Sequence, residues 1–193
     1  MLYTRKGDTG TTKTFGCDQR ISKSSPIAEA LGSLDEINSF LGLVKVTSHD
    51  VTFVLSGKKI SVSEMIGRIQ QDLFIIQAEL AGAEKTIAAE KVLWLESIVD
   101  SIEKALPPIT AFFVSGGTEL TVRFDIARTI VRRAERRVIG VVDASGNKPK
   151  EDGGIVIGVH TLAYLNRLSS VFYACARMIN LLHGVVEESP TYD

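Results

Sequence analysis

The arginines of one short segment are the side chains of this sequence best suited to bind a multiply charged anion. They are Arg128, Arg132, Arg133, Arg136 and Arg137. In a helix, Arg128, Arg132 and Arg136 lie one turn apart on one face, where each like-charge pair costs about 0.2–0.5 kcal/mol. A charge-assisted hydrogen bond to a phosphate oxygen is worth about 1.5–3 kcal/mol, so a bound polyphosphate would outweigh this repulsion. The alternative is a helix face that is solvated or paired with acids, for which Asp35 and Glu36 are the obvious candidates.

A polar N-terminal segment could form a second anion-binding element. It reads Thr4-Arg5-Lys6-Gly7-Asp8-Thr9-Gly10-Thr11-Thr12-Lys13. Glycines let the backbone turn its N–H groups toward an anion, and threonine hydroxyls and basic side chains add donors and charge. The segment lacks the GK[ST] ending of a Walker A loop. It is therefore either a phosphate-binding loop of another kind or a flexible N-terminal tail.

Polar side chains also recur along one side of an otherwise apolar segment near the C-terminus. They are Asn166, Ser170, Tyr173 and Arg177. Because buried polar groups need hydrogen-bond partners, this stripe faces a ligand, a partner helix or water. Further upstream, Phe112 and Phe113 precede Gly116-Gly117, so large apolar side chains stand on a loop that glycine makes mobile. These aromatic rings either fill the core or contact a ligand.

Other chemistries have no support in the sequence. None of His49, His160 and His183 has a glutamate three residues before it, so the ExxH motif of a di-iron bundle is missing. No zinc-site spacing, dinucleotide fingerprint or hydrolase elbow is present. The two cysteines, Cys17 and Cys175, are far apart and predict reduced thiols in a cytoplasmic protein.

The composition predicts a folded globular protein without bulk charge. The chain has 193 residues, of which 45% are hydrophobic, and its 22 Lys and Arg nearly balance its 23 Asp and Glu. This balance argues against binding nucleic acid or a membrane surface through bulk charge. We find neither a secretory signal at the N-terminus nor an apolar run of about 18 residues that could span a membrane. We therefore expect a cytoplasmic protein with no membrane or nucleic-acid partner.

Helices must position these residues, because apolar residues recur every three to four positions from Pro26 onward. Ser25 as the cap and Pro26 as the first helical residue predict the start of the first helix. Its apolar stripe consists of Ala30, Leu34, Ile37, Leu41 and Val44. Four further helices are expected from a cap at Ser61 or Ser63 to Gly82, from about Glu90 to Ala105, from about Thr118 to Val142 and from about Ile155 to Leu182.

We find no convincing set of strands and no internal repeat. The predicted fold is therefore all-α, a five-helix bundle around one core. We expect a single domain over residues 1–193. It comprises a loop over 1–25, the bundle over 26–184 and a short tail over 185–193.

Five motifs together resemble one protein family. They are Thr4-Arg5-Lys6-Gly7-Asp8-Thr9-Gly10 with Thr12, Gly32-Ser33-Leu34-Asp35-Glu36-Ile37-Asn38-Ser39, Phe112 through Gly117, Ala127 through Arg136, and Asn166-Arg167-Leu168-Ser169. In this order they look like the PduO-type ATP:cob(I)alamin adenosyltransferases, from Tyr3 to about Asn180. The resemblance implies a homotrimer with active sites between subunits. It also implies transfer of the 5′-deoxyadenosyl group of ATP to the cobalt of cob(I)alamin, giving adenosylcobalamin and triphosphate.

The resemblance also implies roles for residues at matching positions. The implied ATP-binding residues are Thr4, Arg5, Lys6, Gly7, Asp8, Gly10, Thr12, Lys23, Arg132, Arg133, Glu135, Arg136 and Asn166. Glu135 is also the implied anchor of a magnesium ion. The implied catalytic and cobalamin-binding residues are Asp35 and Arg128, as an intersubunit ion pair, and Phe112, which would cover the lower face of cobalt.

The implied role of Phe112 has a physical rationale. Adding an electron to Co(II) is easier when no lower axial ligand donates density, so an apolar ring that excludes water and the nucleotide base favours Co(I). The sequence departs from the family where Ser170 replaces the usual aspartate, where Val114-Ser115 replaces Leu-Pro, and in its short tail from Val185 to Asp193. These departures concern how the corrinoid is capped.

Two other functions are compatible with the sequence. A trimeric carrier of adenosylcobalamin would hand the product to a mutase or dehydratase without turnover. A helix rich in arginine could instead bind nucleic acid or act as a scaffold, although the net charge of −1 argues against it. For the enzyme, a flavoprotein reductase and an adenosylcobalamin-dependent enzyme are the expected further partners.

Overall fold

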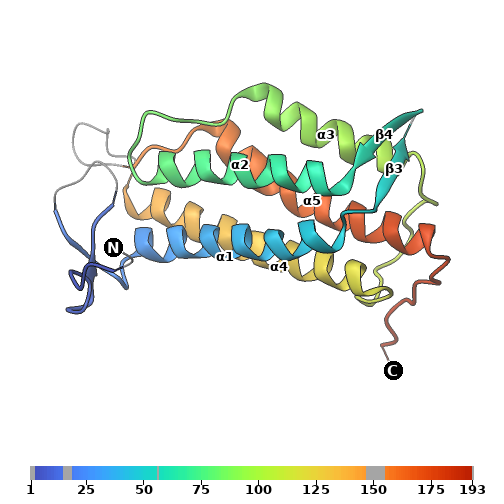
Figure 1. The fold of residues 1–193 in the computed structure, drawn as a ribbon, viewed down its shortest axis with the longest axis horizontal. Coiled ribbons are helices and arrows are strands. Elements are labelled where there is room, and N and C mark those ends of the chain that lie inside the picture. Colours follow the sequence, from blue (N-terminus) through green and yellow to red (C-terminus); the bar gives the residue numbers. More distant parts are fainter. Residues whose placement is uncertain (1–2, 15–18, 56, 147–154, 193) are drawn as a thin grey trace.

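The structure is a computed structural model, and it describes residues 3–14, 19–55, 57–146 and 155–192. The described residues form five helices, as the apolar periodicity predicts. They are α1 (Pro26–Thr47), α2 (Val62–Leu80), α3 (Ala89–Glu103), α4 (Glu119–Ala144) and α5 (Val159–Leu182). Figure 1 shows these helices side by side along the long axis of the molecule.

Side-chain caps fix where three of the helices begin. Ser25 accepts a hydrogen bond from the Ala28 backbone N–H, with Pro26 as the first helical residue, as predicted. Ser61, the first of the two predicted alternatives, caps α2, and Thr118 caps α4 by accepting from the Thr121 backbone N–H. These caps satisfy N–H groups that the first turn of a helix leaves without a partner.

The core lies where the apolar stripes of the helices meet. Helix α4 packs against α1 and α5, while α5 also packs against α3 and α1 against α2. The predicted stripe of α1, from Ala30 to Val44, is completely buried. Helix α5 is buried over most of its circumference, which explains its unusually apolar sequence. No helix within the described ranges is both long enough and apolar enough to cross a bilayer.

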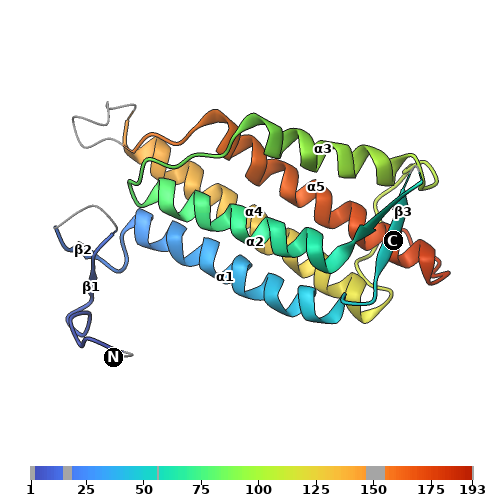
Figure 2. The same cartoon turned by 45° about the horizontal axis from the view of Figure 1, so that its top comes forward.

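We expected no convincing set of strands, and the structure corrects this with two short antiparallel pairs. The polar stretch between α1 and α2 forms an antiparallel hairpin of β3 (Thr52–Leu55) and β4 (Lys58–Ser61). Phe53 and Leu55 alternate into the core, and Gly57 turns the chain with φ +77°. A second short pair joins β1 (Thr11–Thr12) to β2 (Ile21–Ser22) in the N-terminal segment. Figure 2 shows the two hairpins at opposite ends of the bundle.

The predicted start of the last helix at Ile155 is also wrong, because α5 begins at Val159. Gly158 has an extended conformation, with ψ 145°. Its backbone N–H donates a 2.8 Å hydrogen bond to Glu79 Oε1 of α2. The Thr161 hydroxyl donates to the other oxygen of the Glu79 carboxylate. This distant acid holds the residues on either side of the start of α5, and it could not be read from the local sequence.

A second buried carboxylate joins three helices. Asp72 of α2 is 1% exposed, forms an ion pair with Lys91 of α3 and accepts a 2.9 Å hydrogen bond from the Tyr164 hydroxyl of α5. Burial, followed by the neighbouring Asp72 carboxylate, raises the pKa of Tyr164, so its hydroxyl stays protonated and donates. This network fixes how α2, α3 and α5 sit against one another.

Candidate functional site

A cleft of about 820 Å³ opens where the loop between α3 and α4 meets the C-terminal segment. Its walls come from residues 106–116, the first half of α4, the second half of α5 and Glu187. The volume is in the range of sites that enclose a small organic ligand. In Figures 1 and 2 the loop and the C-terminus lie at the same end of the bundle.

The arginines of α4 differ in how far neighbouring acids neutralise them. Arg133 forms an ion pair with Glu36 of α1, one of the two predicted acidic partners. Arg132 is exposed and lines the cleft, and within the described ranges no carboxylate pairs with it or with the exposed Arg136. The alternative of a helix face neutralised by acids therefore holds for Arg133, while Arg132 and Arg136 keep their charge available to an anion.

The charge of Arg128 is partly balanced by Asp125 of the same helix. Its Nε atom is buried and lies 3.9 Å from Asp125 Oδ1, too far for a hydrogen bond. Burial raises the pKa of Asp125, although the Arg128 charge opposes that shift. Asp35, the implied partner of Arg128, is exposed on α1 and pairs with no described residue of the chain. An intersubunit Asp35–Arg128 pair therefore remains a proposal.

Glu135 and Asn166, both named as implied ATP-binding residues, meet between α4 and α5. The Asn166 side-chain amide donates a 3.0 Å hydrogen bond to Glu135 Oε1. Arg167 donates to Asn166 Oδ1 at 2.9 Å and is itself held by Glu96 of α3. Among the described residues no group of three or more metal-binding side chains occurs. Glu135 is thus a single oriented carboxylate, which suits a magnesium ion that takes its other ligands from phosphate and water.

The N-terminal segment forms a succession of turns, and most of its described residues are exposed. The backbone N–H of Gly10 donates to Gly7 O at 3.2 Å, and that of Lys23 donates to Gly10 O at 2.9 Å. The Lys23 ammonium lies against Gly7, 3.1 Å from where a Cβ atom would stand. Arg5 has φ 58°, the one positive φ outside glycine among the described residues. Such a strained backbone is typical of functional loops.

Arg20 holds this segment together, and sequence reasoning missed it. Its guanidinium donates to the main-chain oxygen of Lys6 and to both the hydroxyl and the carbonyl of Thr11, the last two at 2.7 and 2.8 Å. A single arginine in a polar loop carries no spacing signal that could have predicted this. Asn180 at the cleft was missed because its partners Thr121 and Gly116 are distant in the sequence. Asp125, three residues from Arg128, was also missed.

Phe112 stands at the mouth of the cleft and is 81% exposed, while its neighbour Phe113 is half-buried under Arg177. The polar residues of the predicted α5 stripe therefore face two different parts of the molecule. Asn166 contacts α4, whereas Ser170, Tyr173 and Arg177 line the cleft. An aromatic ring so exposed does not fill the core, which favours contact with a ligand or a neighbouring subunit.

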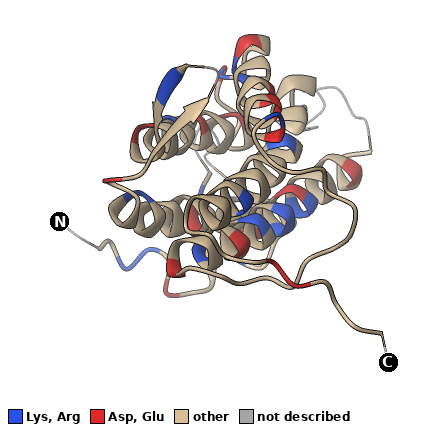
Figure 3. Ribbon diagram, turned by 90° about the vertical axis from the view of Figure 1, so that its right-hand side faces the viewer, with Lys and Arg blue, Asp and Glu red and all other residues tan. Residues whose placement is uncertain are grey.

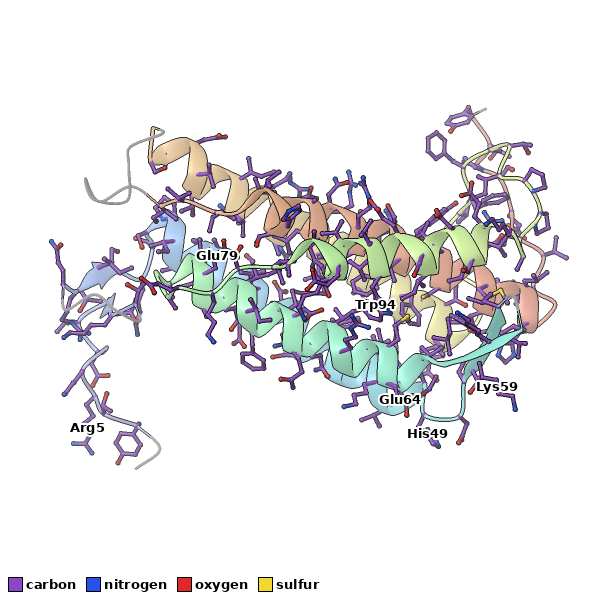
Figure 4. All side chains as sticks on the ribbon, turned by 90° about the horizontal axis from the view of Figure 1, so that it is seen from above. Arg5, His49, Lys59, Glu64, Glu79 and Trp94 are labelled. Carbon is purple, nitrogen blue, oxygen red and sulfur yellow. The ribbon has the colours of Figure 1, made fainter. Side chains whose placement is uncertain are left out.

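The N-terminal segment and the loop that carries Phe112 lie at opposite ends of one subunit. Figure 4 places Arg5 at the end away from Lys59 of β4, which lies beside the cleft end. Helix α1 has 22 residues, so about 33 Å separates the two ends. The N-terminal segment therefore lies far from the loop over residues 106–116, whereas the cleft extends along α4 as far as Arg132.

The cysteines contribute no chemistry that the structure describes. Cys175 is completely buried in α5, and burial raises the pKa of its thiol, which leaves it protonated and unreactive. Cys17 lies outside the described residues. Figure 3 shows Lys and Arg residues interspersed with Asp and Glu residues on the helices, in agreement with the net charge of −1.

The sequence matches the family described as cobalamin adenosyltransferase over residues 2–179. It is 35% identical over 191 residues to a corrinoid adenosyltransferase of Bacillus subtilis (strain 168), covering 95% of this chain and 89% of that protein. It is 34% identical over 183 residues to the corrinoid adenosyltransferase PduO of Citrobacter freundii, covering 91% of this chain. The chain spans about half the length of that PduO relative, 49%.

The fold is similar to that of a solved adenosyltransferase. A phenylalanine-to-alanine variant of the PduO-type ATP:corrinoid adenosyltransferase from Lactobacillus reuteri, complexed with cobalamin and ATP, aligns with a TM-score of 0.80 and 28% identity. The alignment covers 100% of both chains.

Proposed function

This chain belongs to the cobalamin adenosyltransferase family, and from that premise we propose that it transfers the 5′-deoxyadenosyl group of ATP to cob(I)alamin, releasing triphosphate. The observation that carries the proposal is the cleft. Arg132, which pairs with no described acid, lies in its wall, and the exposed Phe112 also lines it. An anion-binding group and an apolar ring at one opening suit a reaction that joins a nucleotide to a corrinoid.

The nucleotide would be held by its triphosphate. Arg132 and Arg136 would donate to phosphate oxygens, and the N-terminal segment from Thr4 to Thr12 would add backbone N–H groups, with Lys23 supplying further charge. Cobalt in the Co(I) state attacks C5′ directly, so no protein nucleophile is needed. The work of the chain would be to orient ATP and to stabilise the charge of the leaving triphosphate.

A magnesium ion would be held at Glu135, whose carboxylate is oriented by Asn166. When bound, the ion would neutralise phosphate charge that the arginines do not reach. Asn166 would then act by keeping the Glu135 carboxylate turned toward the nucleotide.

The active site would be completed by a second subunit. Because the N-terminal segment and the loop that carries Phe112 lie at opposite ends of α1, which is about 33 Å long, a homotrimer that brings one chain's segment to the next chain's cleft would complete the site. Val122 and Ile126, one turn apart on α4, are 40% and 42% exposed, which favours a subunit contact there. Asp35 of one subunit would then pair with Arg128 of another.

Turnover tests this function. Purified protein is mixed with chemically reduced cobalamin, excess ATP and magnesium, and adenosylcobalamin and triphosphate are measured over time. Many products per subunit support the enzyme, whereas one stoichiometric round would favour the carrier of adenosylcobalamin. Loss of ATP preference with a steep salt dependence would point to the nucleic-acid alternative. We place the enzyme in the cytoplasm, with a flavoprotein reductase upstream and an adenosylcobalamin-dependent enzyme downstream.

Replacing Phe112 with alanine is expected to lower kcat about tenfold while leaving the KM for ATP unchanged. The alanine would let water or the nucleotide base reach the lower face of cobalt, which makes Co(I) harder to form. Steady-state kinetics and ATP binding measured by calorimetry check both parts. Phe74→Ala, which removes a ring that is 57% exposed on α2 away from the cleft, is the matched control. An equal loss in both variants would contradict the role of Phe112.

A further inference from the structure

Arg177 is a buried arginine whose contacts join three separate segments of the chain. It lies on α5, is 7% exposed and forms an ion pair with Glu187 of the C-terminal segment. Its guanidinium also stacks on the Phe113 ring, 4.0 Å from the ring centroid, and donates to the Tyr173 hydroxyl at 3.3 Å. A buried guanidinium needs both a counter-charge and a flat partner, and here they come from two segments that are distant in sequence.

Further hydrogen bonds tie the same two segments to each other. The Val114 backbone N–H donates to Glu188 O at 2.8 Å. The Asn180 side-chain amide donates to Glu187 Oε1 at 3.0 Å and to Gly116 O at 3.1 Å. The loop approaches Asn180 so closely that a Cβ atom at Gly117 would stand 2.2 Å from Asn180 Oδ1. The loop and the C-terminal segment are therefore held together on α5.

We propose that the Arg177–Glu187 pair is a latch that fastens residues 185–192 to the loop over residues 106–118 and so sets the position of Phe112. Phe112 is the next residue to Phe113, so a shift of the loop backbone at Phe113, released from Arg177, carries Phe112 with it. Arg177 and Glu187 are thus positioning residues for the corrinoid step. This role rests on the proposed function. Through it, residues 185–192 would help to position the part of the cleft that faces the corrinoid.

The closing test compares Glu187→Gln with Glu188→Gln. The first removes the charge opposite Arg177 but keeps an oxygen that can accept from Asn180. The second removes the same charge one residue later, from an exposed side chain that forms no hydrogen bond or ion pair with any described residue. Amide hydrogen exchange over residues 110–117 is expected to quicken about tenfold in Glu187→Gln and to stay at the wild-type rate in Glu188→Gln.

The kinetic readout separates positioning from general damage. In Glu187→Gln the KM for cob(I)alamin is expected to rise about tenfold while the KM for ATP stays constant, because the latch lies at the corrinoid side of the cleft. The absorption spectrum of bound cob(II)alamin, which reports whether the lower axial ligand has left, is expected to shift toward the ligated form. Exchange and corrinoid KM equal to those of Glu188→Gln would overturn the latch.

The exchange measurement needs no turnover, so the two proposals can fail separately. Faster exchange in Glu187→Gln from a protein without adenosyltransferase activity would uphold the latch as a joint between segments and refute the proposed function. An active enzyme whose exchange does not respond to Glu187→Gln would uphold the function and refute the latch.

Discussion

Arg132→Ala is expected to lower kcat/KM for ATP about 100-fold, which is the loss typical of removing one preorganised donor to developing charge. Arg132 lines the cleft and has no acidic partner among the described residues, so its full charge is available to the triphosphate. The triphosphate gains charge as it leaves, so the loss should fall on kcat as well as on KM. The KM for cob(I)alamin is expected to stay within a factor of about two.

Arg137→Ala is the matched control for this experiment. Arg137 is an exposed arginine of the same helix, and it pairs with no described acid. It lies about 140° around the helix axis from Arg132, so it does not face the same ligand. Steady-state kinetics with ATP varied at saturating cob(I)alamin measures both variants. Equal losses in the two would mean that α4 attracts ATP by general charge, and wild-type kinetics in Arg132→Ala would remove Arg132 from the site.

Asp72→Ala is expected to lower the free energy of unfolding by about 4 kcal/mol, in the range for breaking a buried ion pair. The substitution would leave the half-buried Lys91 ammonium without its counter-charge and the buried Tyr164 hydroxyl without its acceptor. For a protein whose total stability is about 5–15 kcal/mol, this is a large share. The loss should appear as a lower urea midpoint with an unchanged m-value.

Two further variants separate the contribution of the Tyr164 hydrogen bond from that of the Asp72–Lys91 ion pair. Tyr164→Phe removes one hydrogen bond and keeps the ion pair, so it is expected to cost about 1 kcal/mol. Asp100→Ala removes an exposed acid of α3 and is expected to change stability by less than about 0.5 kcal/mol. If Asp72→Ala costs no more than Asp100→Ala, the buried network contributes nothing to the fold.

The candidate site was predictable in part because its elements are marked by residue type and local spacing. The arginines of α4, the glycine and threonine pattern of the N-terminal segment and the Glu135 and Asn166 motifs could all be found without a structure. Which arginine is neutralised could not, because Glu36 and Arg133 are 97 residues apart. The same holds for Arg20, Asn180 and the Arg177–Glu187 pair, whose partners meet only after the chain has folded.

The sequence by itself determined the five helices of this protein, since apolar periodicity and the caps at Ser25, Ser61 and Thr118 act over a few neighbouring residues. Only the tertiary structure decided that α5 begins at Val159, where Glu79 of α2 holds Gly158 and Thr161. It also decided that the polar stretch with Phe53 and Leu55 forms a hairpin. It likewise decided that the N-terminal segment and the loop that carries Phe112 stand at opposite ends of one subunit. Local patterns select a helix because its hydrogen bonds join near neighbours, whereas a cleft or a buried ion pair depends on packing between distant segments.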